Sequence, residues 1–262
     1  MGEIRIGTSG YSFKDWRGVF YPEGLPDRDM LRFYSRHFDT VEINSTYYRI
    51  PSPRTFEAMV RKTPEGFEFT VKAHQEITHA RGDVEGAVEA MKESIKPLVE
   101  SGKFGGMLLQ FPYSFKLSDE NVDYLRKVRD LLGEYPLFVE FRHRSWIKAH
   151  VFELLRELGM GYCCVDEPRL RGLVPPVIAA TSNVGYVRFH GRNAAKWWEG
   201  DSSERYDYLY SEEELAGAIV VDSEGYVSGI MSSLKMTEEN IFLVVKGRKG
   251  KEVVLPWDMI KH

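Results

Sequence analysis

The stretch TVEINSTYYRIPSP, from Thr40 to Pro53, decides the fold. It begins with an alternating pattern, in which Val41 and Ile43 are apolar while Glu42 and Asn44 are polar. Successive side chains of a strand point to opposite faces, so the carboxylate and the amide share one face. Similar stretches recur along the chain with long helical segments between them. This alternation favours a parallel sheet covered by helices, whose polar face lines the inside of a barrel or a cleft.

Seven strands and several intervening helices follow from the same patterns. The predicted strands are Ile4 to Ser9, Thr40 to Ser45, Phe67 to His74, Gly106 to Phe111, Leu137 to Arg142, Gly161 to Asp166 and Gly185 to His190. Two of the predicted helices begin after a capping residue: one runs from Asp27 or Asp29 to His37, and one from Ser118 to Leu132. Two more run from Pro53 to Lys62 and from Val84 to Ser101. A fifth has Val151, Leu154, Leu155 and Leu158 on one face, and a short sixth helix is predicted near Val177 to Ala180. The order predicts a TIM (β/α)8-type barrel rather than an open doubly wound sheet, because no GxGxxG fingerprint follows the first strand.

The rhythm of strands and helices breaks after Leu215. A short helix is expected after Ser211, and the remaining residues 216–262 are predicted to be a small all-β segment, with turns at DSEG (222–225) and at Gly247 to Gly250. Either Ala218 to Val221 serves as the eighth strand, or the barrel is incomplete in this chain. The predicted domains are therefore residues 1–215 and residues 216–262.

Length and composition limit the number of domains, the type of partner and the cellular location that we expect for this protein. A chain of 262 residues suits one large α/β domain, or a domain of about 200 residues with a small appendage. A net charge of −4 implies no general attraction to nucleic acid or membrane. The adjacent Cys163 and Cys164 point to opposite faces of a strand, which argues against a disulfide between them. With no basic apolar leader and no apolar run of about 18 residues, we expect a soluble, cytoplasmic protein.

The candidate site comes from the polar positions that alternate with apolar ones along the strands. The residues assigned to the inward face are Arg5, Ser9, Glu42, Asn44, Thr70, Lys72, His74, Gln110, Glu140, Arg142, Tyr162, Cys164, Asp166, Arg188 and His190. Catalytic groups of TIM barrels lie at the carboxyl ends of the strands, so these residues predict a site at that mouth. The loop after the seventh predicted strand adds Arg192 and Asn193, and often holds phosphate in this fold.

The inward set carries more cations than carboxylates. In a concave site of low dielectric constant this balance favours an anionic ligand, most simply a phosphate or a carboxylate. Aromatic residues of the loops, among them Tyr47 and Trp197, are expected at the rim, where they suit stacking of a base or sugar, including single-stranded nucleic acid. The predicted catalytic residues are Glu42, Glu140, Asp166 and His190. The predicted substrate-binding residues are Asn44, Tyr47, Lys72, His74, Gln110, Arg142, Arg188, Arg192, Asn193 and Trp197.

Several readings of this set stay open. The carboxylates and cations could form a satisfied polar core with no catalytic role. A divalent metal could be held by His74, His190 and Glu140, although the sequence has no tight ligand spacing such as HExxH. Glu140 or Asp166 could act as a base with a histidine as acid, and a pair of carboxylates could serve a glycosidase.

The chain resembles the YecE-like family, a group of proteins that share domain of unknown function 72. The runs that carry the resemblance are IGTSGYSFKDWRGVFYP, TVEINSTYYRIPSPRTFEAM, FTVKAH, LLQFP, FVEFRH, YVRFHGRN and RYDYLYSEEEL, in this order from Ile4 to Leu215. The resemblance implies a TIM barrel and no particular reaction. The tail departs from the family, whose members continue into a longer helix and a strand with an Asn-Asn-His type motif, and instead is similar to PRC-barrel segments.

Together these observations favour an enzyme, hydrolase-like, acting on a phosphorylated or other anionic substrate. The competing interpretation is a non-catalytic module that binds a ligand or single-stranded nucleic acid, and whose PRC-like tail docks a protein or ribonucleoprotein partner. No interaction with a membrane is expected.

Overall fold

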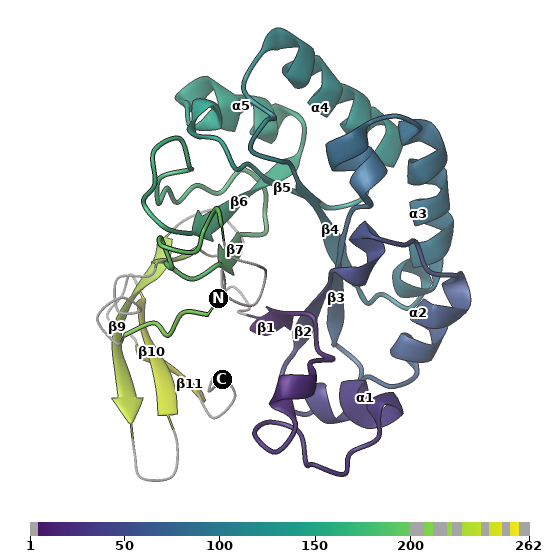
Figure 1. The fold of residues 1–262 in the computed structure, drawn as a ribbon, viewed down its shortest axis with the longest axis vertical. Helices are drawn as coiled ribbons and strands as arrows, with labels where there is room; N and C mark the ends of the chain where they lie inside the picture. The colour runs from purple at the N-terminus through teal and green to yellow at the C-terminus, as the bar shows by residue number, and fades with distance from the viewer. Residues whose placement is uncertain are drawn as a thin grey trace. The chain divides into compact units, whose positions relative to one another are not determined.

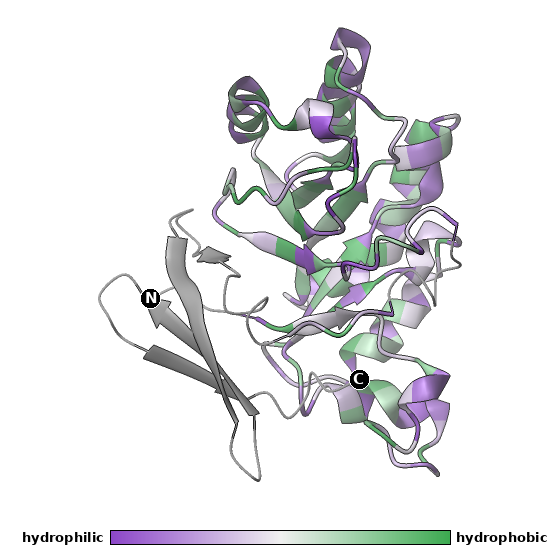
Figure 2. Ribbon diagram, turned by 60° about the vertical axis from the view of Figure 1, so that its left-hand side comes forward, coloured by the Kyte–Doolittle hydropathy of each residue, from purple (hydrophilic) through white to green (hydrophobic). Residues whose placement is uncertain are grey.

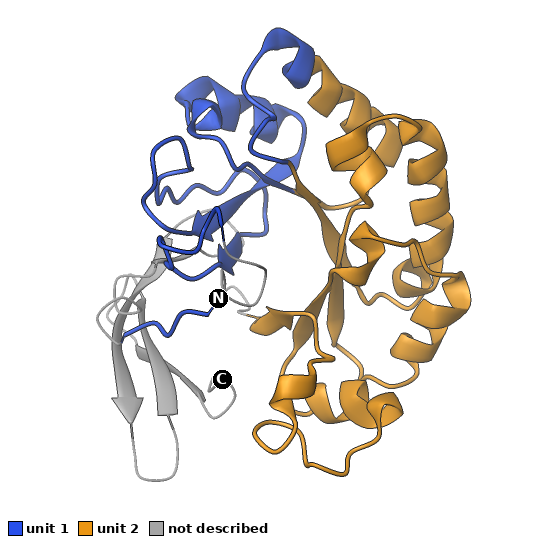
Figure 3. Cartoon of the chain, viewed as in Figure 1, with its two compact units in different colours: residues 1–3, 112–122, 139–260 blue, residues 4–111, 123–138, 261–262 orange. Residues whose placement is uncertain are grey.

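The computed structural model describes residues 5–199 and 207–211, together with the backbone of residues 219–221, 227–236, 241–247 and 252–256. The chain divides into two compact units, which Figure 3 shows in different colours. Unit 1 consists of Met1–Glu3, Pro112–Val122 and Val139–Ile260, and unit 2 consists of Ile4–Phe111, Asp123–Phe138 and Lys261–His262. Each unit is thus built from more than one segment of the chain.

The main sheet contains seven strands in the order in which they occur in the sequence. They are β1 (Gly7–Ser9), β2 (Thr40–Ile43), β3 (Glu68–Lys72), β4 (Phe104–Gln110), β5 (Leu137–Glu140), β6 (Met160–Asp166) and β7 (Tyr186–Phe189). The pairs β1–β2, β2–β3, β3–β4 and β6–β7 are parallel. All seven predicted strands are confirmed. A sequential order is typical of β/α barrels, whereas a doubly wound sheet reverses its strand order at a switch point.

Five α-helices follow the strands. They are α1 (Met30–Tyr34), α2 (Pro53–Val60), α3 (Val84–Glu100), α4 (Asp119–Leu132) and α5 (Ala149–Glu157). The predicted cap at Ser118 is confirmed, because its Oγ accepts a hydrogen bond from the Asn121 amide at 3.3 Å. The predicted helix start is confirmed in part, because Asp29 is the N-cap residue of α1, but neither its side chain nor that of Asp27 makes a capping hydrogen bond, and the helix ends at Tyr34 rather than at His37. The prediction of a short helix near Val177 to Ala180 is wrong, because these residues form no helix. A helix of four residues would gain too few hydrogen bonds to offset the free-energy cost of nucleation.

In unit 2, helices α1, α2 and α3 lie along one side of strands β1 to β4 (Figure 1). Val41 and Val71 are fully buried, and their branched side chains suit a pleated, packed surface. Apolar residues gather in the strands and on the inner sides of the helices, while hydrophilic residues lie on the outer helix surfaces (Figure 2). The alternate positions Glu42 and Thr70 are buried as well, so the polar face of these strands does not face open water, as the sequence predicts.

In unit 1, α5 packs against β6 through Val151, Leu154 and Leu155, which are buried. Trp146 is fully buried and stacks on Phe141, with ring centroids 4.3 Å apart. Its indole N–H donates to the Phe115 carbonyl at 2.7 Å, so the one polar group of this large side chain is satisfied. This core holds the segment that follows β5 in a fixed position.

A second sheet of four antiparallel strands is formed after residue 218. Its strands are β8 (Ile219–Val221), β9 (Val227–Met236), β10 (Ile241–Gly247) and β11 (Glu252–Pro256), in the order β11-β10-β9-β8. The all-β character predicted here is confirmed for the described strands. The turns predicted at 222–225 and 248–250 and the helix predicted after Ser211 lie outside the described residues. β8 pairs with β9 and belongs to the second sheet, so Ala218 to Val221 does not supply an eighth strand to the main one.

Candidate functional site

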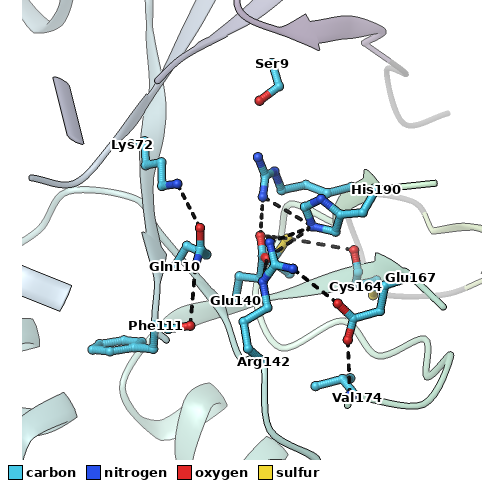
Figure 4. A network of polar contacts seen from close by, with 12 residues as sticks. Ser9, Lys72, Gln110, Phe111, Glu140, Arg142, Cys164, Glu167, Val174 and His190 are labelled. Atoms are coloured by element: carbon cyan, nitrogen blue, oxygen red, sulfur yellow. Dashed lines mark hydrogen bonds and ion pairs between the residues drawn. The ribbon is translucent and has the colours of Figure 1, made fainter. Parts of the chain in front are cut away.

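Glu140, the last residue of β5, is the centre of an ion-pair network in unit 1 (Figure 4). Its Oε1 lies 2.6 Å from Arg142 Nε, and its Oε2 lies 2.6 Å from a terminal nitrogen of Arg188. His190 Nε2 is 3.2 Å from Oε1. The Glu140 side chain is fully buried, whereas those of Arg142 and Arg188 keep 13% and 11% of their surface exposed. The cations therefore lie between the buried anion and the outside of the unit.

The charges of this network hold Glu140 and His190 in defined protonation states. Burial by itself raises the pKa of Glu140, but Arg142 and Arg188 outweigh burial and keep that pKa well below its usual range. Burial and the charge of Arg142 lower the pKa of His190 to about 4, against the opposing effect of Glu140. At neutral pH the site thus contains an ionised carboxylate and a neutral imidazole.

Glu167 is a second buried carboxyl group of the same network. Its Oε2 accepts from Arg142 at 3.2 Å, and its Oε1 accepts from the Val174 amide at 3.2 Å. Burial raises the pKa of Glu167 to about 7, since the ion pair with Arg142 offsets only part of the loss of hydration and Glu140 adds repulsion. A carboxyl group with this pKa can donate or accept a proton near neutral pH.

The sequence analysis missed Glu167 because it assigned β6 to the wrong face. Tyr162 packs its ring on Phe152 of α5, and Cys164 Sγ is 3.6 Å from the Ala179 carbonyl. Cys163 is the residue that faces the network, with its Sγ 4.0 Å from Glu140 Oε2. The inward assignment of Tyr162 and Cys164 is therefore wrong. Every second residue from Cys163 points to the same side of the strand, and this series continues through Val165 to Glu167. The sequence would therefore have predicted Glu167 if the face of Cys163 had been taken as the inward one.

Asp166 forms a separate pair at the end of β6. Its two oxygens accept from Arg192 Nε at 2.7 Å and from a terminal nitrogen at 2.6 Å. Tyr210 donates its hydroxyl hydrogen to Asp166 at 2.9 Å, and the same hydroxyl oxygen accepts from the Gly191 amide at 2.9 Å. The side chain of Arg192 is 30% exposed, which makes it the most accessible guanidinium of the group.

Other residues of the loop after β7 surround these pairs. Trp197 is buried. Its ring centroid lies 5.9 Å from Arg142 Cζ and 6.4 Å from the ring centroid of His190. Asn193 donates to the Asp207 carbonyl at 3.4 Å. Unit 1 therefore brings together seven of the predicted site residues. They are Glu140, Arg142, Asp166, Arg188, His190, Arg192 and Trp197.

Unit 2 contains its own polar cluster on strands β1 and β2. Ser9 Oγ donates to Glu42 Oε1 at 2.8 Å and accepts from the Asn44 amide group. Glu42 is buried, as predicted, while Asn44 lies in the turn that follows β2. These contacts place a predicted carboxylate and a predicted amide side by side.

Lys72 is the cation of unit 2 at the end of β3. Its Nζ donates to Gln110 Oε1 at 2.8 Å, as Figure 4 shows, and lies 4.6 Å from the ring centroid of Tyr47. His74 Nδ1 accepts from the Glu76 amide at 3.3 Å, so one ring nitrogen serves the local turn. Lys72 thus contacts both Gln110 and Tyr47, and His74 takes part in a turn at this end.

Within the described part of the chain, no group of three or more His, Cys, Asp or Glu side chains could hold a metal ion. The metal site predicted from His74, His190 and Glu140 therefore has no counterpart there. Cys163 and Cys164 are both buried thiols. Among the described helices, none combines the length and the apolar character needed to cross a membrane.

The family described as "Protein of unknown function DUF72" matches residues 5–242. This chain belongs to the DUF72 family. The assignment confirms the resemblance to the YecE-like group. The match extends past Leu215, where the resemblance was expected to end, so β8 and β9 fall within the DUF72 region.

Relatives from several organisms match most of this chain. The UPF0759 protein YunF of Bacillus subtilis is 37% identical over 229 residues, covering 81% of this chain and 80% of its own. A crystal structure of a DUF72 family protein from Thermotoga maritima has a TM-score of 0.74 at 46% identity, and covers 80% of this chain and 83% of its own. One from Enterococcus faecalis has a TM-score of 0.73 at 30% identity, covering 82% and 81%.

Proposed function

We propose that this DUF72 protein is an enzyme that binds a phosphorylated or otherwise anionic substrate on Arg142, Arg188 and Arg192 of unit 1. The observation that carries the proposal is the order of burial. The side chains of Glu140 and Glu167 are fully buried, while those of Arg142, Arg188 and Arg192 keep 13%, 11% and 30% of their surface exposed. Asp166 is 18% exposed, so Arg192 is the most accessible charged side chain of the group and the first that an approaching ligand meets.

The charge balance supports an anion as well. Three guanidinium groups stay protonated at neutral pH, and they face the carboxyl groups of Glu140, Asp166 and Glu167. Because the pKa of Glu167 is about 7, this carboxyl group is only partly ionised at neutral pH, which tips the balance of charge toward the positive side. Guanidinium groups match phosphate and carboxylate geometry with paired hydrogen bonds, and they act more strongly where water is excluded.

Glu167 supplies the proton chemistry of the proposed reaction. An anion bound to Arg142 weakens the favourable effect of that guanidinium on ionised Glu167, so the bound state favours protonated Glu167. A protonated carboxyl group can donate its proton to the leaving oxygen of a phosphoester while water forms the new bond to phosphorus, the bond to the leaving oxygen breaks, and the proton of the water passes to the solvent. His190 stays neutral, and its Nε2 lies 3.2 Å from Glu140 Oε1 and 3.3 Å from a terminal nitrogen of Arg142.

The binding part is tested with matched arginine variants. Arg192→Gln removes the most exposed guanidinium, while Arg17→Gln removes an arginine that pairs with Asp27 in unit 2. We expect calorimetric titration with inorganic phosphate and ribose 5-phosphate to show roughly tenfold weaker binding for Arg192→Gln, because a charge-assisted hydrogen bond contributes about 1.5–3 kcal/mol. Arg17→Gln should bind like the wild type. Equal affinities for all three proteins would contradict the proposal.

The catalytic part is tested with Glu167→Gln, which removes the titrating proton and keeps the shape of the side chain. We expect phosphate release from a phosphorylated ligand that binds to fall by roughly 10²–10⁴-fold, the usual contribution of general acid–base catalysis. Binding of the ligand should persist. Turnover that is unchanged in Glu167→Gln would remove this residue from the reaction.

A non-catalytic binding module is the second candidate function. The observation in its favour is that the buried carboxylates are already engaged in ion pairs, as a satisfied polar core would be. Such a module would bind a ligand or single-stranded nucleic acid, with residues 216–262 docking a protein or ribonucleoprotein partner. Binding of phosphorylated ligands without turnover of any, together with salt-sensitive binding of an oligonucleotide, would favour this second function.

A further inference from the structure

Three rings of unit 1 form an aromatic ledge, defined by Trp198, Tyr113 and His143. The centroids of Trp198 and Tyr113 are 5.4 Å apart with a near-perpendicular arrangement, and those of Tyr113 and His143 are 4.9 Å apart. Trp198 is 56% exposed, although its neighbour in the sequence, Trp197, is buried. An indole left at the surface forgoes the burial that favours aromatic side chains in a core, so its position calls for an explanation.

Both ends of the ledge are attached beside Arg142. His143 directly follows Arg142 in the chain, and Trp198 directly follows Trp197, whose ring centroid lies 5.9 Å from Arg142 Cζ. The ledge and the guanidinium network are therefore joined through adjacent residues of the chain at two points within unit 1. This proximity along the chain, together with the exposure of Trp198, supports an aromatic surface near the arginines.

The middle ring of the ledge rests on a close backbone contact. A Cβ atom at Gly172 would lie 2.1 Å from the Tyr113 hydroxyl oxygen, so a larger residue there would displace the Tyr113 side chain. Gly172 also adopts a φ of +92°, and its carbonyl accepts from the Arg144 amide at 2.9 Å. The loop that carries Gly172 thus holds Tyr113 in place under Trp198.

We infer that the anionic substrate carries a flat aromatic ring that stacks on Trp198, as the base of a nucleoside monophosphate would. This inference rests on the proposed function, because the arginines must hold the phosphate. Trp198 then acts as a specificity-determining residue, and Tyr113 and His143 position it. Stacking of one base on an aromatic side chain contributes roughly 1–3 kcal/mol, which corresponds to roughly a fivefold to hundredfold change in affinity.

The test compares two ligands that differ only by the base. Adenosine 5′-monophosphate and ribose 5-phosphate are titrated into the full-length protein, into Trp198→Ala and into Tyr48→Ala. Tyr48 is the control, since it is an exposed aromatic residue of unit 2. We expect the nucleotide to bind at least fivefold more tightly than the sugar phosphate in the wild type and in Tyr48→Ala. Trp198→Ala should remove this difference while leaving the affinity for ribose 5-phosphate unchanged.

The other outcomes separate the two proposals. Equal affinity of the wild type for both ligands would overturn the inference and leave the proposed function standing. A loss of affinity for both ligands in Trp198→Ala would assign Trp198 a structural role, and would also overturn the inference. If neither ligand binds the wild type, the proposed function itself fails.

Discussion

Two buried groups of unit 1 respond to pH in opposite directions. Glu167 has a pKa of about 7 in the folded chain, above its ordinary value of 4.5, and His190 has a pKa of about 4, below its ordinary value of 6.5. Between pH 4.5 and 7 the folded chain keeps a proton on Glu167 that the unfolded chain has released, so rising pH lowers the free energy of unfolding. Between pH 4 and 6.5 the unfolded chain keeps a proton on His190 that the folded chain lacks, so rising pH raises the free energy of unfolding.

The two effects are of similar size and nearly cancel in the wild type, so single variants are needed to reveal them. Glu167→Gln should gain about 2 kcal/mol of stability relative to the wild type between pH 5 and pH 7, and His190→Gln should lose a similar amount. Urea unfolding at the two pH values measures both differences. The opposite signs serve as mutual controls, and a Glu167→Gln difference that does not change with pH would contradict the raised pKa of Glu167.

Strand β6 shows how far the sequence could predict the site. The strands with alternating apolar and polar residues, such as β2, were assigned to the correct face, because burial of Val41 and Ile43 leaves Glu42 on the other side. In β6 the residues before Asp166 are all buried, so hydrophobicity does not distinguish its two faces. The choice between them needs the neighbours Phe152 and Glu140, which lie far away in the sequence.

The sequence indicates which types of residue precede a helix, but it does not indicate which of them make a capping hydrogen bond. Asp83 caps α3, with its carboxylate accepting from the Gly86 amide at 3.0 Å, whereas Asp29 precedes α1 without making a side-chain cap. Both are acidic residues before a helix, and sequence alone does not tell them apart. The difference lies in the backbone, since Asp29 has helical dihedral angles after the turn Asp27–Asp29 and its carboxylate cannot take the capping position.

This difference gives a matched prediction for the elements. Asp83→Ala should lower the free energy of unfolding by about 1 kcal/mol, because the first turn of α3 loses a hydrogen-bond acceptor. Asp29→Ala should change it by less than about 0.5 kcal/mol, because the Asp29 side chain makes no capping hydrogen bond that the substitution would remove. Urea unfolding of both variants at pH 7 measures the effect, and equal losses would show that the cap hydrogen bond contributes nothing measurable.

At the level of the whole molecule, the seven-stranded sheet and the second sheet are separate hydrogen-bonded systems among the described strands. The sequence predicted the change of character after Leu215, because the alternation of strands and helices stops there. It left open whether Ala218 to Val221 closes the predicted barrel, since four apolar residues suit either sheet. The pairing of β8 with β9 decides the question in favour of the second sheet.

The separation of the two sheets predicts what removal of the tail does. A chain that ends at Leu215 loses β8 to β11 and no hydrogen bond of the described β1–β7 sheet, so we expect its far-ultraviolet circular dichroism to keep the α/β signature. Its urea midpoint should match that of the full chain, because the main sheet and its helices supply the buried core that unfolds cooperatively. A large drop in the midpoint would instead show that residues 216–262 cover surface of the main sheet. In that case the tail would stabilise the main sheet by packing, without adding an eighth strand to it.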